Sequence, residues 1–410
     1  MSRKPLSLRT VAFLTKALCG VLLLLAILAI TVPSASQADA PNSRPANALN
    51  PVPMPATDAI LSAFDKYEIV ALPAAHGMKD LDDFLLALIR DPRLPQKIND
   101  IAVECGNSLY QPILDRYMAG ENVPFTEVRK VWRNTTQPSC GIDGFYETFF
   151  PLVRAMNQWL PAGQRVRVLA CDPPIDWDLI KTSQDFRTAI VQLSRDASIS
   201  SVIEKEVLSR HRKALMLFGT FHVVHVHGTP AGFFQNDYPN STFVIADLGM
   251  FGTKLSSLSQ NPFAGWPDPS VALAKGTWLG ALDLTHFYPP PDFVDQDCNY
   301  HRAFPKLLQG PMENLVDAFL YLGPQDLRLS EKIPADIVLA ADYMKEWQRR
   351  QALPGSPGRG FDAQAFDQQI LSSAADPVFS LDTSDKPADQ NEIDEAVKMC
   401  REHKSRARTR

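Results

Sequence analysis

The stretch Asp-Ile-Ala-Val-Glu at residues 100–104 is a short apolar run closed by a carboxylate. Such a run, without alternation of polar and apolar residues, is typical of a strand that is buried on both faces. The segment 111–119 that follows has a helical pattern, with Pro112 in its first turn, where a proline is tolerated. A buried strand followed by a helix is the unit from which parallel sheets are built.

The same unit recurs along the chain between residues 58 and 355, which predicts a single α/β domain. Continuous apolar strands separated by helices predict a largely parallel sheet with helices on both faces. The predicted strands are 68–72, 100–104, 166–171, 214–218, 242–246 and 317–322, and the predicted helices are 79–90, 111–119, 145–160, 201–212 and 335–350.

The first 38 residues have the three parts of a secretory signal peptide. Basic residues up to Lys16 precede an uncharged apolar run at 21–32, and small residues follow as far as Ala38. An uncleaved membrane anchor is the alternative, but the run is shorter than the roughly 20 apolar residues that a spanning helix needs. The sequence therefore predicts a periplasmic or secreted protein, with membrane contact only if the signal segment is retained.

The segments that flank the domain are predicted to lack a packed core. Residues 39–57 are rich in Pro, Ala and Asn and are predicted to form a flexible linker. Residues 356–410 are polar and are predicted to be a mostly disordered tail with a short helix near 391–401.

The charge of the chain bears on its partners. Loss of residues 1–38 removes four basic residues and no acidic one, so the formal net charge of −5 becomes −9. An acidic surface argues against nucleic acid or anionic lipid as the main partner.

Five of the six cysteines lie beyond the signal peptide, and none is part of a C-x-x-C pair. A structural zinc site is therefore not expected. An oxidising compartment permits disulfides, and the odd number leaves at least one thiol over. Cys105 and Cys171, each at the end of a predicted strand, are one candidate pair, and Cys140 with Cys298 is another. The sequence does not choose between them.

An ionisable residue follows each of five consecutive predicted strands: His76, Glu104, Asp172, His222 and Asp247. The carboxyl ends of parallel strands meet at one edge of a sheet, and ligands bind outside that edge. The sequence therefore predicts a polar site there.

A structural role in a turn explains some of these five residues better than a role in the site. Asp172 precedes two prolines and Asp247 precedes Leu-Gly, so a turn-forming role is favoured for both. Glu104 follows a buried run and needs a partner or a raised pKa. His76 and His222, at other strand ends of the same edge, are its expected partners.

Further histidines offer alternatives. The run His222-x-x-His225-x-His227 could hold a metal, but in an extended segment His225 and His227 share a face and His222 points the other way. His222 is therefore chosen as the site residue. His286 and His301 lie in Pro- and aromatic-rich loops and could form a lid.

Basic residues around Trp132 could hold an anionic substrate group, although a solvated helix end is favoured. They are Arg129, Lys130 and Arg133. The chain contains no G-x-S-x-G, no H-E-x-x-H and no phosphate loop.

In its order of motifs the chain resembles the clan of ChaN-like haem-uptake proteins, Tiki-type metalloproteases and erythromycin esterases. The clan's first strand ends in Gly-Glu-x-His, and residues 73–76 are Pro-Ala-Ala-His. Its second strand ends in Glu, matched by Glu104. An aromatic helix with a proline is similar to 145–151, and Gly-x-x-His is matched by residues 219–222, with Gly-Thr-Pro at 228–230 similar to the ChaN branch. The resemblance covers roughly residues 66–250.

The resemblance implies a hydrolase of an ester or amide, acting on a small molecule or a peptide. His76 would then be the general base oriented by Glu104, and His222 would stabilise charge or hold the substrate. The clan also implies two alternatives: a protein that binds haem or a divalent metal, with His76, Glu104 and His222 as metal ligands, or a member that has lost activity. Ala74 supports the last, because it stands where the clan has a glutamate.

Overall fold

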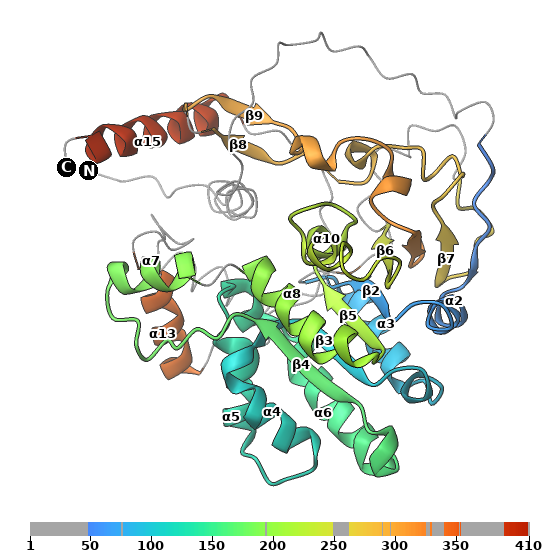
Figure 1. Cartoon of the computed structure of the whole chain (residues 1–410). Coiled ribbons are helices and arrows are strands. Elements are labelled where there is room, and N and C mark those ends of the chain that lie inside the picture. The colour runs from blue at the N-terminus through green and yellow to red at the C-terminus, as the bar shows by residue number, and fades with distance from the viewer. Residues whose placement is uncertain are drawn as a thin grey trace.

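The computed structural model describes residues 48–74, 77–192, 195–248, 262–288, 290–295, 297–324, 329, 340–351, 353 and 389–408. Its centre is an eight-stranded sheet in the order β1-β7-β10-β6-β2-β5-β3-β4 (Figure 1). Pairs from β10 through β6, β2, β5 and β3 to β4 are parallel, whereas β7 is antiparallel to β10 and to β1. The predicted α/β class with a largely parallel sheet is confirmed.

The strands of this sheet are β1 (Met54–Pro55), β2 (Ile69–Pro73), β3 (Asp100–Asn107), β4 (Arg167–Asp172), β5 (Ala214–Phe218), β6 (Thr242–Asp247), β7 (Ser270–Leu273) and β10 (Ala318–Tyr321). A separate hairpin pairs β8 (Asp292–Val294) with β9 (Tyr300–Arg302). The helices are α2 (Ala56–Ala63), α3 (Lys79–Arg90), α4 (Gln111–Met118), α5 (Phe125–Arg133), α6 (Phe145–Trp159), α7 (Ser183–Gln192), α8 (Arg195–Glu206), α9 (Thr220–Val223), α10 (Pro230–Phe234), α13 (Ala341–Gln351) and α15 (Gln390–Arg408).

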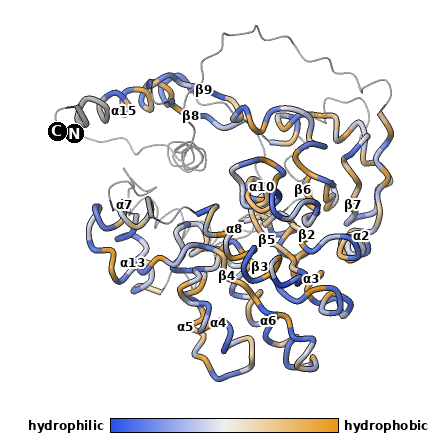
Figure 2. Tube along the Cα trace, in the orientation of Figure 1, coloured by the Kyte–Doolittle hydropathy of each residue, from blue (hydrophilic) through white to orange (hydrophobic). Residues whose placement is uncertain are grey.

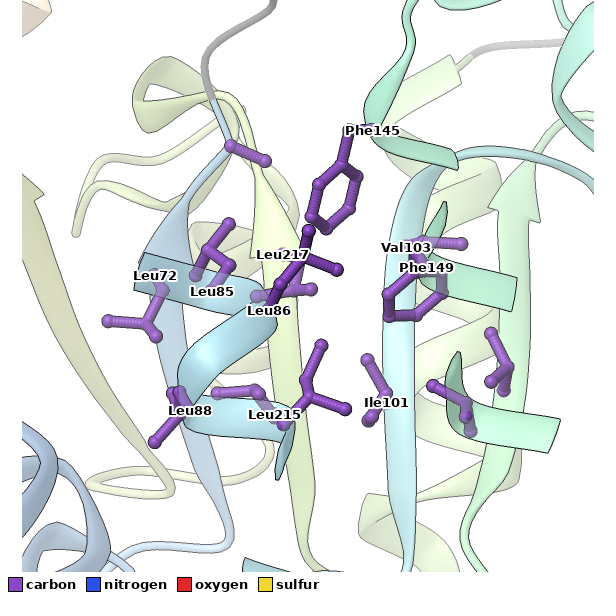
Figure 3. Close-up of a cluster of buried hydrophobic side chains, with 14 of the residues drawn as sticks. Leu72, Leu85, Leu86, Leu88, Ile101, Val103, Phe145, Phe149, Leu215 and Leu217 are labelled. Carbon is purple, nitrogen blue, oxygen red and sulfur yellow. The ribbon is translucent and has the colours of Figure 1, made fainter. Parts of the chain in front are cut away.

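Side chains of one strand alternate between two hydrophobic cores, one on each face of the sheet. Leu215 and Leu217 of β5 belong to the core that α3 and α6 complete, as Figure 3 shows. Met216 and Phe218 belong to the core on the opposite face, together with α8 and α10. Hydrophobic residues are concentrated where the strands lie (Figure 2). Because both faces are covered, the strands need apolar residues at every position, which explains their unbroken apolar sequences.

The sheet contains two short strands, β1 and β7, that the sequence does not predict. Strands of two and four residues have too little periodicity to be recognised. Leu49 bridges Thr277, so the end of the expected linker lies along the sheet edge. In the expected tail, α15 is longer than the predicted helix at 391–401.

Two disulfides join Cys105 to Cys140 and Cys298 to Cys400, and Cys171 is a buried free thiol. Neither suggested pair forms. Cys105 and Cys171 lie on neighbouring strands, but their side chains point into the cores on opposite faces of the sheet. Disulfides are what an extracellular or other oxidising compartment permits. Within the described part of the chain, no helix is long and apolar enough to cross a membrane.

Truncation of the fully buried Leu217 tests this core. We expect Leu217→Ala to lower the free energy of unfolding by about 2–5 kcal/mol, because the lost packing leaves a cavity under α3 and α6. Leu179→Ala is the matched control, since Leu179 is 71% exposed, and its effect should stay within about 0.5 kcal/mol. Urea denaturation followed by circular dichroism measures both, and equal losses would contradict the packing described.

Candidate functional site

The guanidinium group of Arg195 is the centre of a polar cluster at the carboxyl edge of the sheet. Its Nε donates to Asp172 Oδ1 at 2.7 Å, and its Nη2 donates to Glu104 Oε1 at 2.9 Å. Its Nη1 lies 3.0 Å from His222 Nε2. The side chains of Arg195, Glu104 and Asp172 are 14%, 6% and 0% exposed. Three groups distant in sequence therefore meet around one buried cation.

Strand order brings these groups together. Glu104 lies on β3, Asp172 is the last residue of β4, and His222 lies on α9 directly after β5. Because the sheet order is β5-β3-β4, the three segments are neighbours at the same edge. The structure brings Glu104 and His222 together as the sequence predicted, with 3.6 Å between Glu104 Oε1 and His222 Nε2.

Two glycines allow the backbone to approach closely at this edge. The pairing of β3 with β4 is irregular between Val103 and Asn107, around Glu104. A Cβ at Gly106 would lie 2.7 Å from the Ala170 Cα, so only glycine fits beside β4 there. Gly219 donates its N–H to Glu104 Oε2 at 2.5 Å, and a Cβ at Gly219 would lie 3.1 Å from that oxygen.

The hydrogen bonds of His222 define its tautomer. Nδ1 lies 2.8 Å from Asp196 Oδ1, and an ionised carboxylate only accepts, so Nδ1 carries the proton. A guanidinium only donates, so Nε2 accepts from Arg195 and carries a lone pair. His222 is thus a neutral imidazole held by a carboxylate on one side and by a cation on the other, the arrangement expected of an oriented base.

Asp172 departs from its expected turn role. Its Oδ2 accepts the Thr136 N–H at 2.6 Å, and its Oδ1 accepts the Thr136 hydroxyl at 2.9 Å as well as the bond from Arg195. The two prolines after Asp172 predicted a turn. The sequence around Asp172 does not show that its partners, Thr136 and Arg195, come from distant segments. Asp247 is the last residue of β6, and its carbonyl oxygen accepts the Tyr288 hydroxyl at 3.3 Å.

Burial shifts the titration of this cluster. Desolvation raises the pKa of Asp172, although the charge of Arg195 and the Thr136 bonds oppose the rise. Desolvation alone would lower the pKa of Arg195, but the charges of Glu104 and Asp172 outweigh it and raise that pKa further. The guanidinium is therefore charged at every physiological pH.

His76, the expected base, lies outside the described residues, and so does the segment 249–261. The run from His222 to His227 is not a strand: α9 ends at Val223 and residues 224–226 form a bend. His225 Nε2 lies 2.8 Å from Asp317 Oδ2, and His227 packs on the Phe233 ring.

The remaining polar candidates are paired away from the Arg195 cluster. Glu147 forms ion pairs with Arg129 and Arg133, each at 2.9 Å, so both arginines have a carboxylate partner within the protein. Lys130 pairs with Glu127.

The two loop histidines also have partners away from the Arg195 cluster. His301 stacks on Phe293 and bonds Asp295, and His286 bonds Asp283.

A metal does not fit between Glu104 and His222 in this arrangement. The guanidinium of Arg195 occupies that position, and its fixed charge repels a second cation. His222 Nε2 would also have to lose its hydrogen bond before it could coordinate haem iron. Among the described residues, no group of three or more His, Cys, Asp or Glu side chains is placed to hold a metal.

Sequence reasoning missed Arg195, Asp196 and Thr136. The helix was predicted to begin at residue 201, but α8 begins at Arg195. A signal was available, because the buried Ile199 and Ile203 are four residues apart and extend the helical pattern toward the amino end. Nothing in the sequence indicates that Thr136 contacts Asp172.

The fold and the cluster define an α/β protein with an arginine-centred site at the carboxyl edge of its sheet. No family model matches the chain, and no curated protein matches its sequence. A crystal structure of a Bacillus cereus protein aligns with a TM-score of 0.39 and 11% identity, over 67% of this chain and 94% of that protein. The type III effector HopBA1 aligns with a TM-score of 0.31 and 14% identity, over 50% of this chain and 88% of the effector. Similarities this low assign no function.

Replacing Arg195 with methionine tests the electrostatics of the cluster. We expect a loss of about 3–5 kcal/mol in the free energy of unfolding near pH 7, because two buried carboxylates lose their counter-charge. Removal of the cation raises the folded-state pKa of Asp172 further above its ordinary value of 3.8. A carboxyl group with a raised folded-state pKa favours the folded state at low pH, so the loss should shrink as the pH falls toward about 4.

Denaturation curves between pH 4 and pH 8 measure this dependence. Arg187→Met is the matched control, because Arg187 is an exposed helical arginine bonded to Gln184. A pH-independent difference between the two variants would contradict the assigned role of Arg195.

Proposed function

We propose that this protein is a hydrolase of an ester or amide whose general base is His222. The observation that carries the proposal is the Nδ1-protonated, neutral imidazole between Asp196 and Arg195. A histidine that a carboxylate orients through one nitrogen, with the other nitrogen unprotonated, is the form that activates a water or another nucleophile in many hydrolases.

In the proposed reaction Arg195 Nη1 first moves off His222 Nε2. A water molecule then donates to Nε2 and transfers its proton there as the water oxygen adds to the acyl carbon. The imidazolium that forms lies between two carboxylates, because Glu104 Oε1 is 3.6 Å from Nε2 on the side opposite Asp196. The two carboxylates offset the repulsion that the imidazolium meets from the neighbouring guanidinium of Arg195.

The same proton transfer changes the role of Arg195. A protonated Nε2 no longer accepts, so Nη1 remains available to donate to the oxyanion of the tetrahedral intermediate. The imidazolium then gives its proton to the leaving alcohol or amine as the bond from the acyl carbon breaks. The products are a carboxylic acid and an alcohol or amine.

The motif resemblance over residues 66–250 supports the same proposal and leaves a place for His76. β2 lies beside β5 in the sheet, so the turn after β2 begins at the edge that carries His222. The binding alternative for haem or a divalent metal is less well supported, because Arg195 takes the position between Glu104 and His222. The two disulfides and the signal-like start support a periplasmic or secreted location.

Removal of the proposed base is the direct test. A panel of aryl esters and peptides should reveal turnover by the wild-type protein, and His222→Ala should lower kcat about 10²–10⁴-fold. His301→Ala is the control, since His301 lies on the β8–β9 hairpin with its own carboxylate partner. Full activity of His222→Ala together with inactive His76→Ala would transfer the role of base to His76.

Asp196→Asn tests the orientation of the base without removing it. The amide introduced at residue 196 carries no negative charge, so it no longer stabilises the imidazolium, and where its N–H donates to Nδ1 the imidazole proton lies on Nε2 instead. We expect kcat to fall by roughly 10²–10⁴-fold while the free energy of unfolding changes by less than about 1 kcal/mol. Unchanged kcat in this variant would show that Asp196 has no part in the reaction.

A further inference from the structure

The segment 134–137, between α5 and the turn that contains Cys140, is fixed to the polar cluster by several hydrogen bonds. Thr136 donates both its N–H and its hydroxyl to Asp172. The Asn134 carbonyl accepts from the buried Asn107 side chain at 2.7 Å, and the Trp177 indole donates to the Thr135 carbonyl at 3.2 Å. Because each of these bonds has a defined direction, together they set the position of the segment.

Two further elements hold the same segment from outside. The Cys105–Cys140 disulfide ties its far end to β3, at the residue directly after Glu104. Arg350 of α13, only 8% exposed, donates to the Arg133 carbonyl at 2.9 Å and to Asn134 Oδ1 at 2.8 Å. The segment is thus anchored at both ends, and its middle residue is aimed at Asp172.

Asp172 transmits this position to the base. Oδ1 of Asp172 accepts from Arg195 Nε, and the opposite end of the same rigid guanidinium donates to His222 Nε2. Because the guanidinium is planar, fixing its Nε fixes the direction of Nη1 as well. Asp172 would therefore act on His222 and on the proposed oxyanion only through Arg195.

We propose that Asp172 is a positioning residue of the proposed hydrolase site: held by the disulfide-anchored Thr136 segment, it orients Arg195 and thereby keeps the lone pair of His222 on Nε2. The inference rests on the proposed function for its effect on turnover, but its effect on the protonation of His222 does not depend on any substrate. Without the Asp172 charge, Arg195 is held by Glu104 alone and its Nη1 can move off His222. Nε2 can then take up a proton and donate to Glu104, while Nδ1–H stays on Asp196.

The test is nitrogen NMR of protein labelled at histidine, with the His222 signal among the eight histidines assigned by its loss in His222→Gln. In the wild type we expect Nδ1 protonated and Nε2 bare. In Asp172→Asn we expect protonation at Nε2 to appear, with kcat at least tenfold lower and KM close to that of the wild type.

The matched control is Asp100→Asn. Asp100 is 1% exposed and accepts from Arg212 at 2.6 and 2.7 Å, so it is a second buried aspartate–arginine pair, at the opposite end of β3. This variant should lose stability to a similar degree and leave the protonation of His222 and kcat unchanged. A structural role alone would make the two variants behave alike.

Thr136→Val gives the decisive result if Asp172→Asn does not fold, because it removes one donor and keeps the backbone N–H. We expect a shift of the same kind and a smaller fall in kcat, and the double variant Cys105→Ser/Cys140→Ser should produce the same direction of change. Unprotonated Nε2 in Asp172→Asn, or in Thr136→Val where that variant decides, would overturn the proposal. Protonation at Nε2 in a protein without any turnover would instead refute only the hydrolase.

Discussion

The buried guanidinium of Arg195 is the interaction on which the site depends. Glu104 and Asp172 project from neighbouring strands into a region that is almost closed to water. Two carboxylates so placed repel each other and are poorly solvated, and only a shared cation with fixed donor directions makes the arrangement stable. The same cation donates to Nε2 of His222 and so sets which nitrogen is unprotonated.

The sheet explains why this cation reaches all three groups. β5, β3 and β4 are adjacent and parallel, so the chain leaves each of these strands at the same edge. α8 begins at that edge, and its first two residues supply Arg195 to the carboxylates and Asp196 to the imidazole. One helix terminus therefore provides both partners of His222, and the chemistry of the site is tied to the position of α8.

The polar cluster is supported by covalent and hydrogen-bonded anchors rather than by apolar packing alone. The Cys105–Cys140 disulfide, the buried Arg350 and the Asn107 amide all hold the segment that contains Thr136. Such supports are usual around a site whose groups must keep their positions to within a fraction of an ångström. The β8–β9 hairpin and α15, joined by the second disulfide, form a separate unit (Figure 1).

The sequence by itself determined the α/β class, the central strands and the approach of Glu104 to His222, because unbroken apolar strands and the rule for parallel strand ends are local and general. It did not determine the edge strands β1 and β7, the pairing of Cys105 with Cys140 or the role of Asp172. Those depend on which face a side chain points to and on partners that lie tens of residues away. Only the tertiary structure decided that Arg195 is the centre of the site, because the charge that satisfies two buried carboxylates is chosen by proximity in space.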